Sequence, residues 1–172
     1  RAWALSQQYK EASLGLKALA LLDPYYVTRG ELTTALEIGE RAAEMALRAT
    51  DATSVAVAGV LKAWVRFIIG DYVQARDDLE PMMALYDAGA LDLASGWVVS
   101  WTVIALTYMM SSLAFLGYLD RAARRARDAL TLARGLGRTV DVCAALSSVA
   151  SYTYKFRCDY RAARDIAEEA LR

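Results

Sequence analysis

The sequence predicts an all-α protein built as an α-solenoid, which is a stack of antiparallel helix pairs. Composition is the first reason: the 172 residues include only 2 Pro and 10 Gly, whereas sheet proteins need more turn residues and more β-branched runs. Hydrophobic residues make up 56% of the chain, which is enough for a buried core. The second reason is a short pattern that recurs along the chain.

The recurring pattern is a small residue followed two places later by an apolar residue and five places later by Ala. It starts at Gly30, Gly70, Gly117 and Cys158, so successive copies are 40, 47 and 41 residues apart. A period of this length is typical of helical repeats, in which each helix pair buries its apolar face against its neighbours.

Each copy of the pattern predicts how one helix ends and the next begins. The Gly, or Cys158 in its place, allows a tight turn at the end of the first helix. Asp71 and Asp159 are then expected to cap the second helix, because a carboxylate complements the dipole at a helix N-terminus. About one turn further on, small side chains allow the two helices to approach closely: Ala35, Ala75, Ala122 and Ala163.

The apolar periodicity predicts about 8–9 helices, over residues 2–8, 11–28, 31–49, 53–69, 71–88, 93–116, 118–135, 139–157 and 159–171. They form a single repeat domain over residues 1–172, with units at about 10–50, 53–88, 93–135 and 139–172. Pro24 and Pro81 fall inside two of these helices, where we expect a kink or a break. Because the chain starts at Arg1 without Met, we expect it to be a fragment of a longer protein.

The segment Leu93–Leu119 contains 27 residues without a charged side chain, which is long enough to cross a membrane. The alternative is a buried helix at the centre of the repeats. The segment occupies the same place in the repeat as Val55–Ile69 and Val142–Phe156, which carry charges and cannot be membrane spans. We therefore predict that the most buried helix of the chain lies here and that the chain has no membrane segment.

The pattern Gly70-Asp71-Tyr72-x-x-Ala75 resembles the turn of tetratricopeptide (TPR) repeats, although the period here exceeds the 34 residues of that family. Over roughly residues 25–172 the chain also resembles degenerate TPR-like repeats of large bacterial signalling proteins. In those proteins the repeats accompany a STAND-type nucleotide-binding ATPase, an adenylate-cyclase or a LuxR-type DNA-binding domain. The segments that carry the resemblance are Arg29–Leu32, Gly70–Glu80, Leu85–Asp87, Leu116–Tyr118 and Ala129–Arg134. The resemblance implies a right-handed TPR-like superhelix and a regulatory role, and it transfers no catalytic residue.

The residues that carry most catalytic chemistry are missing or isolated. The chain has no His, which removes the usual general base and most zinc sites. Gly135-Leu136-Gly137 is better explained as a helix-ending turn than as a nucleotide-binding loop. The acidic run Asp77-Asp78-x-Glu80 is better explained as a solvated face than as a cation site. We therefore predict that the chain is not an enzyme and has no catalytic residue, metal or cofactor.

Two cysteines bear on the cellular compartment. Cys143 and Cys158 are 15 residues apart, or about 22 Å along one helix, which is too far for a disulfide. We interpret them as buried free thiols of a cytoplasmic protein.

Charge is unevenly distributed along a chain whose total is neutral, with 20 basic and 20 acidic residues. Residues 23–95 hold 12 acids and 6 bases, a net charge of −6, whereas residues 118–138 hold 2 acids and 6 bases, a net charge of +4. The two segments are either solvated faces that differ by chance or surfaces for a contact between acidic and basic segments. The balanced total gives no reason to expect direct binding to nucleic acid or to a membrane.

Aromatic residues recur on the first helix of each pair, which lines the concave face of a solenoid. This pattern favours either packing between repeats or a groove that binds a peptide helix or a small apolar ligand. The expected groove residues are Trp64, Phe67, Tyr108, Ser111, Phe115, Tyr152 and Lys155.

The leading hypothesis is a non-catalytic module for protein–protein interaction and regulation in a bacterial signal-transduction or transcription-regulatory protein. Its partner would be another protein or other domains of the parent chain. One alternative is a scaffold for homo-oligomerisation, because the expected terminal helices expose apolar faces at residues 2–22 and 159–171. The other is an effector-sensing module that binds a small apolar ligand in the concave groove.

Overall fold

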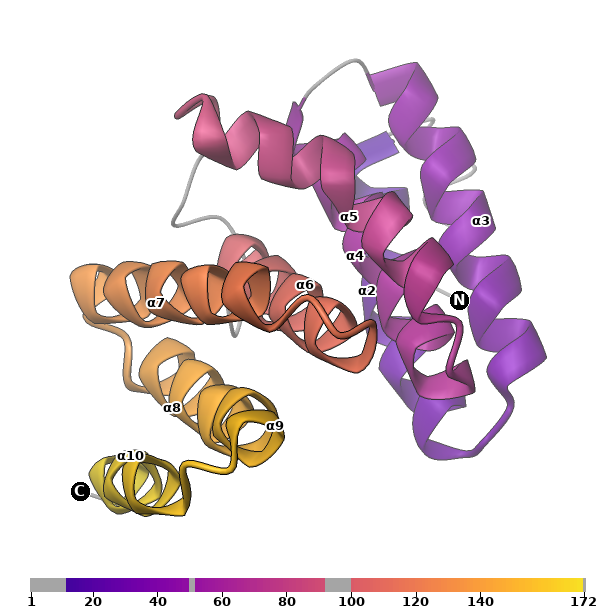
Figure 1. Cartoon of the computed structure of the whole chain (residues 1–172). Coiled ribbons are helices and arrows are strands. Elements are labelled where there is room, and N and C mark those ends of the chain that lie inside the picture. Colours follow the sequence, from indigo (N-terminus) through magenta and orange to yellow (C-terminus); the bar gives the residue numbers. More distant parts are fainter. Residues whose placement is uncertain (1–11, 50–51, 92–99, 172) are drawn as a thin grey trace. The chain divides into compact units, whose positions relative to one another are not determined.

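A computed structural model of the chain describes residues 12–49, 52–91 and 100–171, and all regular secondary structure within these ranges is helical (Figure 1). The predicted all-α fold is therefore confirmed. The chain divides into two compact units, residues 1–91 (unit 1) and 92–172 (unit 2). Each unit holds two of the four predicted repeats. The helix expected at residues 2–8 lies outside the described ranges.

Unit 1 consists of consecutive helices that pack on one another. They are α2 (Ala12–Thr28), α3 (Leu32–Ala49), α4 (Ala52–Ile69) and α5 (Tyr72–Asp87). Each helix packs against the next, and α2 also contacts α4, so the first helices of the two hairpins are neighbours. This is the arrangement expected of stacked helix pairs. The largest fully buried side chains of this unit are Leu19, Val60, Leu61, Val65, Leu79, Met82 and Met83.

Unit 2 repeats this arrangement with one irregularity. Its elements are α6 (Trp101–Phe115), α7 (Leu119–Leu136), α8 (Thr139–Ser148), the π-helical segment η1 (Val149–Tyr154), α9 (Lys155–Arg157) and α10 (Tyr160–Ala170). Consecutive helices pack together, and α6 also contacts α8, as α2 contacts α4 in unit 1. The sequence predicted one regular helix over residues 139–157. A π-helical turn holds one residue more than an α-helical turn, and apolar periodicity over six residues cannot reveal that difference.

The predicted turns are present in both units. Gly30, Gly70 and Gly117 have φ angles of +76°, +95° and +85°, and Cys158 has a φ of +59°. At Gly70 the Gly N–H donates to the carbonyl of Phe67 at 3.1 Å, and the next N–H donates to Arg66 at 2.9 Å. The same pair of hydrogen bonds closes the turns at Gly30 and Gly117. This is the Schellman motif, which satisfies carbonyl groups at a helix C-terminus and requires a left-handed residue.

The predicted caps and close contacts are also present. The carboxylate of Asp71 accepts a hydrogen bond from the Gln74 N–H at 3.2 Å, and that of Asp159 accepts one from the Ala162 N–H at 3.0 Å. Three of the four alanines that follow the turns are completely buried, and Ala163 in α10 is half-buried. In α10, Tyr160 is 69% exposed, and Leu171 just beyond its end is 89% exposed, so this helix does present apolar side chains to solvent.

The prediction of a buried central helix is confirmed for α6, where 11 of the 15 residues are buried. Its first residue is Trp101 rather than residue 93, because Ser100 is non-helical and its hydroxyl accepts hydrogen bonds from the Thr102 and Val103 N–H groups. Residues 93–99 lie outside the described ranges. None of the helices within the described residues is long and apolar enough to span a membrane.

The two prolines do not break their helices. Pro24 lies within α2 and Pro81 within α5, and both helices continue past the proline. Pro81 removes one backbone hydrogen bond. The side chains on either side of it, Leu79, Met82 and Met83, are buried, and α5 as a whole packs against α4.

Candidate functional site

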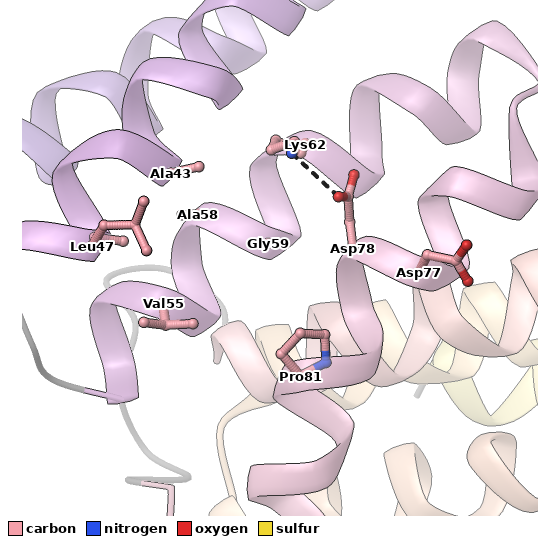
Figure 2. Close-up of a pocket in the computed structure, with 10 residues that line it drawn as sticks. Ala43, Leu47, Val55, Ala58, Gly59, Lys62, Asp77, Asp78 and Pro81 are labelled. Atoms are coloured by element: carbon pink, nitrogen blue, oxygen red, sulfur yellow. Dashed lines mark ion pairs between the residues drawn. The ribbon is translucent and has the colours of Figure 1, made fainter.

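An open pocket lies on unit 1, where α3 and α5 flank α4, and its volume is about 240 Å³ (Figure 2). Figure 2 shows residues of α3 on one side, residues of α5 on the other and one face of α4 between them. The lining residues are Ala43, Ala46, Leu47, Val55, Ala58, Gly59, Lys62, Asp77, Asp78 and Pro81.

Small side chains explain why a pocket exists at this place. Ala43 and Ala58 leave space that larger residues would fill, while Gly59 brings the backbones of α4 and α5 together. A Cβ on Gly59 would lie 2.7 Å from the carbonyl oxygen of Asp78, which is shorter than any normal contact. Larger apolar side chains stand at the rim, where Leu47 is 81% exposed and Val55 is 38% exposed.

One end of the pocket is polar and carries a shared ion pair. Asp78 of α5 faces two cations of α4: Lys62 Nζ at 3.3 Å and Arg66 Nη1 at 2.6 Å. All three side chains are at most 21% exposed, so solvent screens these pairs less than it screens surface pairs. The ion pairs fasten α5 to α4 and leave Lys62 at the edge of the pocket (Figure 2).

For the acidic run Asp77-Asp78-x-Glu80, the sequence left two interpretations, a solvated face or a cation site. Asp78 is occupied by Lys62 and Arg66, and Asp77 pairs with Arg76 at 2.6 Å. Within the described ranges no cluster of three or more His, Cys, Asp or Glu residues could hold a metal ion. The two aspartates therefore serve as ion-pair partners, and the pocket offers apolar walls with a charged end, which suits binding of a side chain.

The expected groove residues of unit 1 lie in α4 but do not line this pocket. Trp64 and Phe67 are both half-buried. The ring of Phe67 packs against that of Tyr72 with a centroid distance of 5.4 Å, which joins the end of α4 to the start of α5. Phe67 thus contributes to the packing of this hairpin.

The expected groove residues of unit 2 fall into two groups. Ser111 in α6 is only 2% exposed, and its hydroxyl donates to the Thr107 carbonyl at 2.7 Å, so it offers no polar group to a ligand. Phe115 is 41% exposed and meets Phe156 edge-on at 4.9 Å. Tyr108 is half-buried in α6 and Lys155 is exposed in α9. Tyr152 lies in η1, and its side chain is outside the described part. A groove formed by these residues together with Trp64 and Phe67 stays a prediction.

Sequence reasoning missed two buried carboxylates. In unit 2, Asp141 is completely buried; it accepts a hydrogen bond from the Ser100 N–H at 2.7 Å and pairs with Arg138 Nε at 2.5 Å. It thereby ties the start of α8 to the start of α6. No local sequence signal could have found this contact, because the partners Ser100 and Asp141 are 41 residues apart.

The second buried carboxylate is Asp23 in α2 of unit 1. It is completely buried, and neither oxygen has a hydrogen-bond partner among the residues that the structure describes. Burial raises the pKa of this carboxyl from 3.8 to about 7, because a charged carboxylate is unfavourable away from water. The sequence signal was available: Asp23 stands in an apolar stretch, directly before Pro24.

The cysteine prediction is half right. Cys143 and Cys158 are free thiols, as predicted, but both are exposed rather than buried. Cys158 is exposed because it occupies the turn position that Gly holds in the other repeats.

The hairpins and the pocket define a helical-repeat protein with an open site whose walls are largely apolar. No protein-family model matches the sequence, and no curated protein matches it significantly.

Proposed function

We propose that this chain is a non-catalytic protein-interaction and regulatory module, of the kind that serves bacterial signal-transduction or transcription-regulatory proteins in the cytoplasm. Its partner is a protein segment, from another molecule or from other domains of a parent chain. The binding surface is the pocket on α3, α4 and α5.

The observation that carries this proposal is an open pocket with apolar walls on stacked helical hairpins. Stacked hairpins provide extended surfaces that accept peptide segments. Leu47 and Val55 line the pocket and are 81% and 38% exposed, so the apolar walls continue to the surface, where a partner can reach them.

The size of the pocket favours a protein side chain over a free small molecule. Its volume of about 240 Å³ is below the range of roughly 300–1,000 Å³ that is typical of small-molecule sites. Its contents would be one or two apolar side chains of a helix that lies between α3 and α5. Effector sensing through a small apolar ligand is the weaker alternative for this pocket for the same reason.

The test uses helical peptides selected from a random display library on the full chain, with Kd measured by fluorescence anisotropy. Leu47→Glu places a charge at the rim of the pocket, and we expect it to raise Kd roughly tenfold for peptides that use the pocket. The matched control is Leu21→Glu, because Leu21 is also an exposed helical Leu of unit 1, at 64%, but does not line the pocket. The control should leave Kd unchanged. Selection that yields no peptide, or peptides that bind both variants equally, would contradict the proposal.

A further inference from the structure

The floor of the pocket is one face of α4, and it changes from apolar to charged along the helix. The lining residues of α4 follow one another at spacings of three, one and three residues, which places them on one face; they are Val55, Ala58, Gly59 and Lys62. Ala58 and Gly59 form the middle of the floor, and Lys62 stands one turn beyond them (Figure 2), or roughly 5 Å along the axis. The floor therefore presents an apolar surface and a cation at a fixed separation.

Positive charge is in excess at the polar end of this floor. The carboxylate of Asp78 is shared by Lys62 Nζ at 3.3 Å and Arg66 Nη1 at 2.6 Å, so two positive charges face one negative charge. Arg66 donates a hydrogen bond to this carboxylate at the shorter distance, whereas Asp78 is the ion-pair partner of Lys62 at the longer one. Because all three side chains are at most 21% exposed, water compensates the surplus charge only in part.

The other acidic groups near the pocket leave this surplus in place. Asp77 also lines the pocket, but its carboxylate accepts hydrogen bonds from Arg76 Nε at 2.8 Å and Nη2 at 2.6 Å, which makes a neutral pair. On α3, Glu40 and Glu44 are exposed, as is Arg41 between them, and all three lie outside the lining, where solvent screens their charges. The lining therefore carries one surplus charge, which is positive.

We propose that Lys62 selects the partner of this pocket by binding a carboxylate, and that the partner is a helical segment with an apolar anchor and an Asp or Glu three or four residues from it. The inference rests on the proposed function and names the chemistry of the partner at the same site. An anchor over Ala58 and Gly59 and a carboxylate beside Lys62 are one helical turn apart on the partner, as they are on α4. Asp78 keeps Arg66 as its partner in the complex, so α5 stays fastened to α4.

The experiment selects helical peptides on the full chain from a display library that fixes one Leu and randomises the positions three and four residues to either side of it. Among peptides that lose affinity for Leu47→Glu, we expect Asp or Glu to be enriched at one of these positions. Fluorescence anisotropy then gives Kd for a selected peptide and for the same peptide with its carboxylate changed to the amide. On the unchanged chain the amide should raise Kd about tenfold, because a charge-assisted hydrogen bond in a partly buried site is lost.

The variant Lys62→Met shows whether this lysine is the group that reads the carboxylate, since Met keeps a long unbranched side chain without the charge. With this variant the acidic peptide and its amide should bind with the same Kd. The matched control is Lys17→Met, because Lys17 is an exposed lysine of α2 in the same unit and does not line the pocket. The control should retain the full preference for the acidic peptide, and circular dichroism checks that both variants stay helical.

The possible failures separate this proposal from the proposed function. Equal affinity of the acidic peptide and its amide for the unchanged chain overturns the proposal without the use of any variant, as does a preference that Lys62→Met retains. Peptides that depend on Leu47 but carry no acid at the randomised positions also overturn it, and they leave the proposed function intact. A selection that yields no Leu47-dependent peptide contradicts both.

Discussion

At the scale of single residues, the least expected feature is a buried carboxylate that has no hydrogen-bond partner among the described residues. Asp23 lies within α2, and burial raises its pKa to about 7. In the unfolded chain the same carboxyl has an ordinary pKa near 3.8. A residue that titrates differently in the folded and unfolded states makes stability depend on pH.

The direction of this dependence follows from the two pKa values. Below pH 3.8 the carboxyl is protonated in both states, and no penalty arises. Between pH 3.8 and about 7 the unfolded chain releases the proton while the folded chain retains it, so the free energy of unfolding decreases as pH rises. Above about pH 7 both states are ionised and the penalty is constant.

We therefore expect Asp23→Asn to remove this decrease. Between pH 4 and pH 8, the free energy of unfolding of the variant should rise by up to about 4 kcal/mol relative to that of the unchanged protein, since each pKa unit corresponds to about 1.4 kcal/mol. Urea unfolding at a series of pH values measures the difference. If the free energy of unfolding changes with pH in parallel for the variant and the unchanged protein over this range, Asp23 is not the group that causes the decrease.

Cys158 is the second residue with a local cost. Its φ of +59° is the only positive value at a non-Gly residue in the described part of the chain, and this conformation disfavours residues that carry a Cβ. We expect Cys158→Gly to raise the free energy of unfolding by about 1 kcal/mol, measured by urea denaturation under reducing conditions. The reciprocal change, Gly117→Ala at a φ of +85°, should lower it by a similar amount. Loss of stability in Cys158→Gly would mean that the thiol makes a contact worth more than the backbone strain.

At the scale of helices, glycine has two different roles that the sequence does not separate. Gly59 is in α4, and a Cβ there would lie 2.7 Å from the Asp78 carbonyl oxygen of α5. Gly135 is in α7, and a Cβ there would meet nothing within 4 Å. Neither has a positive φ, so both differ from the turn glycines.

These two glycines give a matched pair of substitutions. Gly59→Ala should destabilise the protein by about 1–3 kcal/mol, because α4 and α5 must move apart, which outweighs the higher helix propensity of Ala. Gly135→Ala should stabilise it by roughly 0.5–1 kcal/mol through propensity alone. Thermal unfolding followed by circular dichroism compares the two. An equal gain in thermal stability in both variants would disprove the close contact between α4 and α5.

Helix packing also explains the polar residues that hold elements together. Asp78 links α5 to α4 through Lys62 and Arg66, and Asp141 links α8 to the first residue before α6. In both cases a buried or half-buried carboxylate has a partner of opposite charge, which offsets much of the cost of removing the charge from water. Such links can be recognised only when distant segments are brought together.

At the scale of the whole molecule, the uncharged stretch before residue 119 shows how context decides the meaning of a sequence. Its composition alone permits a membrane span. In the described residues it contains α6, which has Ser100 as its cap and is covered by helices of its own unit, including α7 and α8. The repeat pattern predicted this burial, because it made α6 the first helix of a pair that packs against the next pair of its own unit.

The candidate site was far less predictable than the fold. Periodicity located the helices, but the pocket depends on how far α3 and α5 stand apart across α4. That distance follows from the side chains at the contacts, such as Ala58 and Gly59. The expected groove residue Phe67 packs on Tyr72 within its own hairpin, a contact that apolar periodicity does not reveal.

The sequence by itself determined the local features of this protein: helices, the positions of four turns, the aspartate caps and the small residues after them. These follow from backbone geometry and short-range contacts, which a few neighbouring residues control. The tertiary structure alone decided the pocket, the burial of Asp141, and the continuation of helices through Pro24 and Pro81. Those features depend on contacts between segments far apart in the chain, and packing energy there overrides local preference.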